Sequence, residues 1–182
     1  MKQTISAYIE LMKTRVTSLV LVTAYLGYYL GLRSQGEHMA SLESWLVLFY
    51  LLLGTWCTSS GAAVLNQVIE RRHDAKMNRT KNRPLVKGIL QPGQALIFGL
   101  LLSLSGFTFL YYFTNPITAL ISLATIILYI FIYTPSKRIT TWNTIIGSIP
   151  GALPPVGGWT AATGALAPPA WILFGILFCW QM

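Results

Sequence analysis

The chain has 182 residues and a net charge of +8, with 54% hydrophobic and only 10% charged residues. An average soluble domain has about 25% charged residues, so the composition excludes an ordinary soluble protein and predicts that lipid covers much of the surface. The basic residues lie in short segments between long apolar runs. That arrangement argues against a nucleic-acid partner, which would require a continuous basic surface.

Five apolar stretches and the start of a sixth follow one another along the chain. Each of the first four is close to the roughly 20 residues that a helix needs to cross a bilayer, and they cover residues 16–32, 45–65, 95–113 and 117–133. Between the third and the fourth, Asn115-Pro116 predicts a tight turn and therefore a helical hairpin.

The last part of the chain, residues 139–182, contains no charged residue. A fifth stretch, residues 142–163, is interrupted by glycines and prolines: Gly147, Pro150, Gly151, Pro154, Pro155, Gly157 and Gly158. The sixth begins at Pro168-Pro169, and its helix would be about 20 Å long, too short to cross. We therefore expect an all-α, polytopic bundle of about five complete transmembrane helices plus the start of a sixth. This bundle would be a single domain over residues 1–182, truncated at its C-terminal end.

The basic residues predict the orientation in the membrane. If every stretch crosses, the N-terminal segment and the loops at 66–94 and 134–141 share one face, and only Arg33 lies opposite. The basic residues on the shared face are Lys2, Lys13, Arg15, Arg71, Arg72, Lys76, Arg79, Lys81, Arg83, Lys87, Lys137 and Arg138. The positive-inside rule assigns this face to the cytoplasm, or to the matrix of a mitochondrion. Because no signal or transit peptide is evident, we expect a bacterial plasma membrane rather than the mitochondrial inner membrane.

One polar stripe stands out where the second apolar stretch meets its charged loop. Asn66, Glu70 and Asp74 are spaced four residues apart, and on a helix this spacing places them on one face. Two carboxylates and an amide oxygen are suitable ligands for Mg²⁺, particularly when a phosphate supplies further oxygens. The sequence thus indicates a magnesium site at Asn66, Glu70 and Asp74.

Four basic residues follow this stripe directly: Arg79, Lys81, Arg83 and Lys87. Guanidinium groups can hold phosphate oxygens bidentately, and lysines act as point charges. Metal and cations beside apolar helices suit a lipid diphosphate, whose hydrocarbon tail would lie among the helices. Two simpler interpretations also fit: the basic loop could reflect positive-inside topology alone, and Glu70 with Arg71, or Asp74, could form ordinary salt bridges.

The stripe resembles the first signature of the UbiA prenyltransferase superfamily, most closely in its protoheme IX farnesyltransferase branch. The matching run is Asn66-x₃-Glu70-x₃-Asp74-x₂-Met77-x-Arg79-Thr80-x₂-Arg83-Pro84-Leu85. Other segments agree with that branch: Lys13-Thr14-Arg15, Tyr133-Thr134-Pro135-Ser136-Lys137-Arg138, the Gly/Pro run at 147–164 and Trp180-Gln181. The resemblance therefore covers nearly the whole chain.

The resemblance implies a helical bundle around a central cavity, in which Mg²⁺ binds farnesyl diphosphate and the farnesyl group is transferred to a vinyl group of protoheme IX, giving heme O. Asn66, Glu70 and Asp74 would then be the catalytic metal ligands. The diphosphate would be bound by Arg79, Lys81, Arg83, Lys137 and Arg138. Heme A synthase or the assembly of a terminal oxidase are possible partners. The superfamily has a second acidic motif, but no acid follows Asp74 here, so we expect the chain alone to be inactive.

Three other hypotheses remain open from the sequence. The acceptor could be an aromatic quinone precursor instead of heme. A membrane transporter would also have broken helices and polar groups within the membrane, although its site should lie near the bilayer midplane. The chain could also be a non-catalytic remnant.

Overall fold

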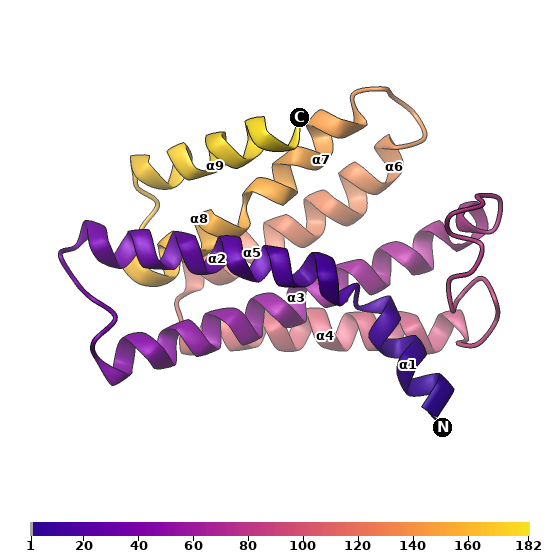
Figure 1. The fold of residues 1–182 in the computed structure, drawn as a ribbon, viewed down its shortest axis with the longest axis horizontal. Helices are drawn as coiled ribbons and strands as arrows, with labels where there is room; N and C mark the ends of the chain where they lie inside the picture. The colour runs from indigo at the N-terminus through magenta and orange to yellow at the C-terminus, as the bar shows by residue number, and fades with distance from the viewer. Residues whose placement is uncertain (1) are drawn as a thin grey trace.

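The computed structural model describes residues 2–182, except for the side chain of Lys2. All regular elements in this part of the chain are helices (Figure 1). They are α1 (Lys2–Leu11), α2 (Thr14–Ser34), α3 (Leu42–Asp74), α4 (Pro92–Phe113), α5 (Pro116–Ile127), the π-helix η1 (Leu128–Tyr133), α6 (Thr134–Ser136), α7 (Asn143–Ala152), α8 (Pro154–Thr163) and α9 (Pro168–Gln181). The predicted all-α fold is confirmed.

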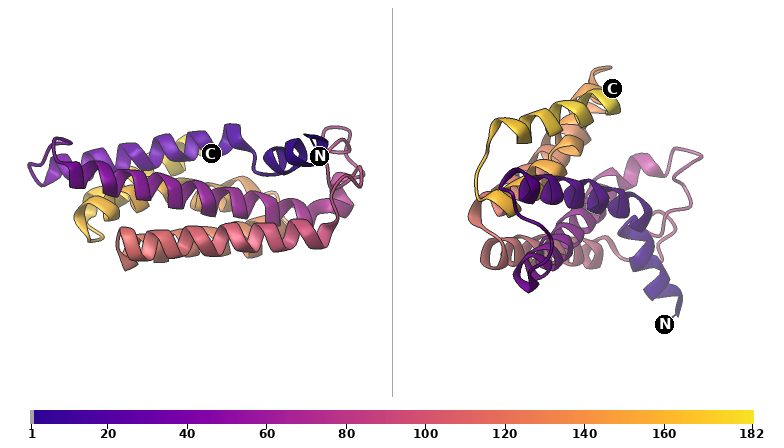
Figure 2. Two further views of the ribbon diagram at one scale, coloured as in Figure 1. Left: turned by 90° about the horizontal axis from the view of Figure 1, so that it is seen from below. Right: turned by 60° about the vertical axis from the view of Figure 1, so that its left-hand side comes forward.

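Four segments are long and apolar enough to cross a membrane: Thr14–Ser34, Leu42–Asp74, Pro92–Phe113 and Pro116–Ser136. Figure 2 shows α2, α3 and α4 running along the long axis of the bundle. Asn115 begins α5 as its N-cap, because its Oδ1 accepts a hydrogen bond of 2.9 Å from the backbone N–H of Thr118. This cap, followed by Pro116, produces the predicted hairpin between α4 and α5.

The fifth apolar stretch is divided into two helices of ten residues each, α7 and α8, which meet at Leu153. Pro154 and Pro155 open α8, where the missing N–H groups of proline cost no hydrogen bond. The stretch predicted as one interrupted crossing is therefore a pair of short helices. Broken helices in membranes occur where the backbone faces protein or a cavity.

Small residues let α8 pack directly against α2. A Cβ atom added to Gly158 would overlap the carbonyl oxygen of Ala24, and one added to Gly27 would overlap the carbonyl oxygen of Pro155. The two backbones are therefore in direct contact, as in other membrane helix pairs that pack through glycine.

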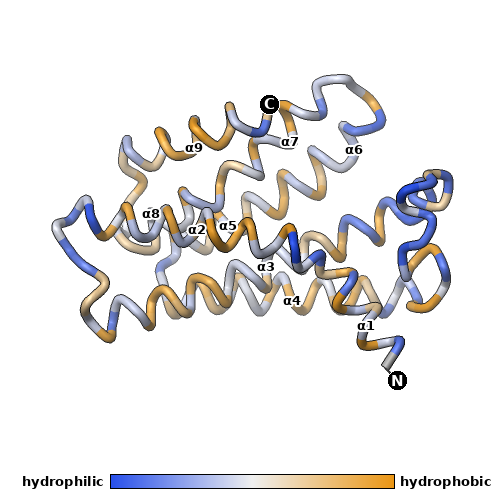
Figure 3. The backbone as a smooth tube through the Cα atoms, viewed as in Figure 1, coloured by the Kyte–Doolittle hydropathy of each residue, from blue (hydrophilic) through white to orange (hydrophobic). Residues whose placement is uncertain are grey.

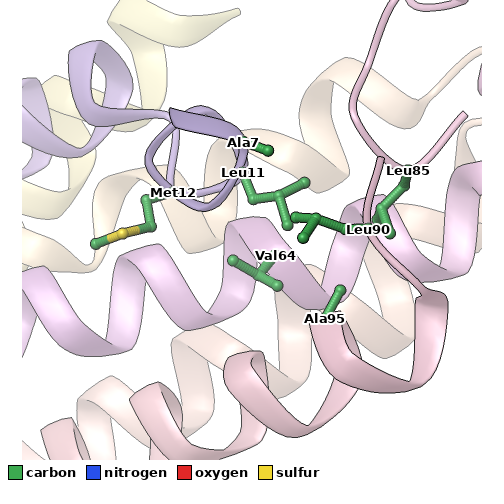
Figure 4. Close-up of a cluster of buried hydrophobic side chains, with 7 residues drawn as sticks. All are labelled: Ala7, Leu11, Met12, Val64, Leu85, Leu90 and Ala95. Atoms are coloured by element: carbon green, nitrogen blue, oxygen red, sulfur yellow. The ribbon is translucent and has the colours of Figure 1, made fainter. Parts of the chain in front are cut away.

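A buried apolar cluster fixes the N-terminal helix and the loop after α3 (Figure 4). Its members come from α1, the link between α1 and α2, α3, α4 and the 75–91 loop: Ala7, Leu11, Met12, Val64, Leu85, Leu90 and Ala95. The Gln67 side chain adds a hydrogen bond of 2.8 Å from Nε2 to the carbonyl oxygen of Leu11. These contacts place the start of α2 beside the C-terminal half of α3.

The polar loops lie at the two ends of the bundle (Figure 3). The 75–91 loop, the loop after α6 and the N-terminal helix share one end in Figure 1, and the loop between α2 and α3 lies at the other. The orientation predicted from the sequence requires these basic loops to lie at the same end of the bundle. One end of the multi-pass helical fold is thus strongly basic, and Arg33 lies at the other end.

Candidate active site

The predicted polar stripe lies on the last turns of α3, which at 33 residues extends well past the apolar stretch. Asn66 is buried, and the side chains of Glu70 and Asp74 are only 14% and 6% exposed. Two acids and one amide are thus held in a sheltered position at the basic end of the bundle.

Each acid of the stripe has a basic partner from another segment. A side-chain nitrogen of Arg83 contacts a carboxylate oxygen of Asp74. Lys137, just after α6, places Nζ 3.2 and 3.3 Å from the two carboxylate oxygens of Glu70. The fold therefore brings together five of the residues predicted from the sequence: Asn66, Glu70, Asp74, Arg83 and Lys137.

The loop that carries Arg83 is anchored to α3 at the same point. Thr80 is buried, and its hydroxyl donates a hydrogen bond of 2.9 Å to the backbone carbonyl of Asp74. Because Pro84 and Leu85 are also buried, Arg83 is held on both sides along the chain. The RTxxRPL run of the sequence thus has a structural explanation.

The remaining predicted diphosphate ligands lie on the surface of the same end. Arg79, Lys81 and Arg138 are exposed, and Lys81 donates a hydrogen bond of 3.2 Å to Asn78 Oδ1. The structure does not bring these three into the paired cluster, and their role in binding phosphate stays a prediction. The side chain of Lys2 lies outside the described part.

The chemistry of the stripe fits a hard cation. The Asn66 Oδ1 atom is buried and has no hydrogen-bond partner within the described chain, and an amide oxygen of this kind is a ligand that Mg²⁺ accepts. Residues 2–182 contain no cluster of three or more His, Cys, Asp or Glu side chains able to chelate a metal. Asn66, Glu70 and Asp74 could thus hold a cation only with further oxygens, such as those of a phosphate.

A cavity of about 440 Å³ begins beside this cluster and continues between α2, α3, α5, α7 and α8. Lys13 and Tyr133 line it near the charged end, and Leu51, Leu110 and Thr118 line it deep in the bundle. Several residues of the Gly/Pro run also line it: Gly147, Pro150, Gly151, Pro154 and Gly157. The broken α7–α8 segment therefore forms one wall of the cavity.

The model of the UbiA prenyltransferase family matches residues 17–182. The chain belongs to the UbiA prenyltransferase family. It is 46% identical over 176 residues to a protoheme IX farnesyltransferase of Solibacter usitatus, an alignment that covers 96% of the chain and 60% of that protein. A protoheme IX farnesyltransferase of Koribacter versatilis is 45% identical over 174 residues, which cover 96% of the chain and 55% of that protein.

One solved structure has a similar fold. Work on digeranylgeranylglyceryl phosphate synthase in membranes provides a structure that matches with a TM-score of 0.79 at 19% identity, covering 100% of this chain and 60% of the other. At this identity the match shows the fold alone. The chain spans 55–60% of the length of the relatives described above.

Three features of this UbiA-family site were not assigned to the stripe on α3 from the sequence. Thr134 accepts a hydrogen bond from Asn66, Tyr133 lies under the Lys137 ammonium at 4.4 Å from the ring centroid, and Lys13 faces the cavity. The segments containing these residues resembled the family, but neither spacing nor composition assigned them to the stripe on α3. Only the packing of α2 and α5 against α3 brings them there.

Lys13 is a partly buried cation beside the site. It lies between α1 and α2 in a left-handed backbone conformation with φ of 49°. Burial, assisted by the positive charges of Arg83 and Lys137, lowers the pKa of Lys13 from 10.5 to about 8. The charges of Glu70 and Asp74 oppose this effect. A bound anion would stabilise the charged form of Lys13 and raise its pKa again.

We expect the lowered pKa of Lys13 to make stability depend on pH. Between pH 8 and 10.5 the unfolded chain retains the Lys13 proton while the folded chain releases it, so the free energy of unfolding rises with pH in this interval. Relative to a Lys13→Met variant, the wild-type protein should therefore gain stability from pH 8 to 10.5. Denaturant titrations in detergent measure this difference. A difference that stays constant over the interval would contradict the assignment.

Proposed function

We propose that this chain forms the diphosphate-binding part of a protoheme IX farnesyltransferase, which converts farnesyl diphosphate and protoheme IX into heme O and diphosphate. The observation that carries the proposal is the paired cluster of Glu70, Asp74, Arg83 and Lys137 at the charged end of a membrane cavity. The choice of heme as acceptor rests on the names of the relatives at 45–46% identity.

The cluster suits an anion that arrives together with a cation. Asn66, Glu70 and Asp74 would hold Mg²⁺, which when bound neutralises charge on the diphosphate. Arg83 and Lys137 are now engaged by the carboxylates, so each can exchange its carboxylate partner for phosphate oxygens. Lys13, whose charge interacts with the other charges of the cluster, adds a third positive charge. The site thereby stabilises negative charge as the diphosphate leaves.

In the proposed reaction, the first carbon of the prenyl chain would lie between the charged cluster and the apolar cavity. The bond between the first prenyl carbon and the diphosphate oxygen breaks, and its electron pair leaves with the oxygen. The vinyl group of heme forms the new carbon–carbon bond, and water adds to the resulting cation and releases a proton. The apolar cavity walls would hold the farnesyl chain and restrict access of water to the allylic carbon.

The membrane setting of this proposal follows from the charge distribution. We propose that the basic end faces the cytoplasm of a bacterium, or the matrix if the protein is mitochondrial, as the positive-inside rule favours. A transporter is less well supported, because the ion pairs lie at one end of the bundle rather than near its middle. Heme A synthase or a terminal oxidase assembly would be the partners that receive heme O.

The acceptor is tested with the full-length protein in membranes. It is supplied with farnesyl diphosphate, Mg²⁺ and either heme or a hydroxybenzoate, and products are identified by mass. The proposal is supported if heme is converted to heme O, the hydroxybenzoate is not prenylated, and heme O formation stops when EDTA removes the metal. Prenylated hydroxybenzoate without heme O would instead establish the aromatic-acceptor alternative.

The contribution of residues 1–182 is tested by comparing the activity of this chain with that of the full-length protein. We propose that residues 1–182 alone do not complete the metal site, since the described chain offers no third acid at the cluster. The chain of 182 residues should therefore form no heme O in the same assay in which the full-length protein is active. Turnover by the shorter chain would overturn this part of the proposal.

A further inference from the structure

Thr134 occupies a fully buried position directly after the π-helix η1. Its backbone N–H donates to the carbonyl oxygen of Tyr129, five residues earlier. Its hydroxyl donates to the same carbonyl oxygen at 2.8 Å. In a regular α-helix the Thr134 N–H would bond to residue 130 instead, so the π-turn gives the Tyr129 carbonyl two donors from Thr134.

This arrangement fixes the orientation of the Asn66 side chain. A threonine hydroxyl has a single hydrogen, and Thr134 already uses it on Tyr129. Thr134 Oγ1 can therefore only accept from Asn66, 2.8 Å away, and the Asn66 atom that faces it must be the NH₂ group. The two ends of an amide are otherwise hard to distinguish, but here the bonding requires that Oδ1 point away from Thr134.

The consequence is an amide oxygen left without a partner. Asn66 Oδ1 is buried and accepts no hydrogen bond within the described chain. Buried polar groups in proteins are nearly always paired, so this oxygen is available for a group absent from the protein itself. It lies on the helix face that carries Glu70 and Asp74 one and two turns further on.

We propose that Thr134, held by the π-helix, is a positioning residue that keeps the Asn66 carbonyl oxygen turned toward the bound cation. The inference rests on the proposed function, because it assumes a divalent cation and diphosphate at the stripe. Without the Thr134 acceptor, the Asn66 amide can rotate and turn its NH₂ group toward the cation. The partial positive charge of the NH₂ group would then repel the cation.

The test is a double-mutant cycle in the full-length protein. Thr134→Val removes the hydroxyl and keeps the shape, and Thr134→Ser keeps the hydroxyl. Both changes are made in the wild-type and in an Asn66→Asp background, where the two carboxylate oxygens are equivalent and orientation no longer matters. Binding of Mn²⁺ in the presence of inorganic diphosphate is measured by electron paramagnetic resonance.

In the wild-type background we expect Thr134→Val to weaken Mn²⁺ binding by about ten-fold or more, as for other residues that orient metal ligands. Thr134→Ser should bind Mn²⁺ as the wild type does. In the Asn66→Asp background, Thr134→Val should have an effect of less than about two-fold, because a carboxylate cannot present a donor.

Two results would overturn the inference: the first leaves the proposed function intact, and the second overturns that function as well. If the wild type binds Mn²⁺ and diphosphate but Thr134→Val weakens binding equally in both backgrounds, Thr134 has only a structural role. If the wild type binds no Mn²⁺ with diphosphate, the cation site itself is wrong, and the proposed function fails along with the inference.

Discussion

Replacing Asp74 with asparagine in the full-length protein is expected to lower kcat/KM for farnesyl transfer by roughly 10²–10³-fold, because it weakens the hold on the cation that would stabilise the charge developing on the diphosphate. The change keeps the shape of the side chain and removes its negative charge. The Thr80 bond is to the backbone carbonyl of Asp74, so the loop should keep its anchor. Arg83, whose side chain is 21% exposed, loses its counterion and remains near the diphosphate site.

The rate is measured as heme O formed per time at several concentrations of farnesyl diphosphate. Glu37→Gln serves as the matched control, since Glu37 is exposed in the loop at the opposite end of the bundle. The control should retain wild-type activity. An Asp74→Asn variant that folds normally and keeps more than half of the activity would remove Asp74 from the proposed site.

Gly158→Ala is expected to have the largest effect on stability, lowering the free energy of unfolding by about 1–3 kcal/mol, as overpacking usually does. The added methyl group would overlap the Ala24 carbonyl oxygen and would lie 2.8 Å from the backbone nitrogen of Tyr28. These are backbone atoms, so rotation of a side chain cannot relieve the overlap. The helices α2 and α8 would have to separate, which would disturb two walls of the cavity.

Gly175→Ala is the matched control, because a Cβ atom at Gly175 in the middle of α9 would have no neighbour within 4 Å. This variant should be as stable as the wild type, or more stable by up to about 1 kcal/mol from helix propensity. Unfolding of both variants in mixed detergent micelles gives the comparison. Equal stability of the two variants would show that α2 and α8 are not in the close contact described above.

Much of the fold follows from features that repeat along the sequence. Apolar stretches near the length of a membrane crossing predict the helices, and Asn115-Pro116 predicts the hairpin because cap and turn chemistry are local. The four-residue spacing of Asn66, Glu70 and Asp74 predicts that they share one helix face. The family assignment from the run at 66–85 is confirmed by the match over residues 17–182.

The site itself was less predictable, because its partners come from distant segments. Several basic residues follow the stripe, and nothing in their spacing indicates that Arg83 pairs with Asp74 while Arg79 stays exposed. The π-helix η1 depends on backbone hydrogen bonds that reach five residues back instead of four, and this shift has no clear signal in an apolar run. Lys13 lies beside the cavity because α2 packs against α3, and its sequence position alone indicated only the family resemblance and the membrane orientation.

The length of α3 has a mechanical consequence. One continuous helix lines the cavity at Leu51 and Ala63 and carries Asp74 at its C-terminal end. At 1.5 Å per residue, Leu51 and Asp74 are about 35 Å apart along a single rod. The angle between the cavity-lining residues and the charged stripe around the helix axis is therefore set by the regular α-helix, which turns by about 100° per residue. A tilt of α3 as a rigid rod would therefore move Leu51 in the cavity wall and Asp74 in the charged stripe together.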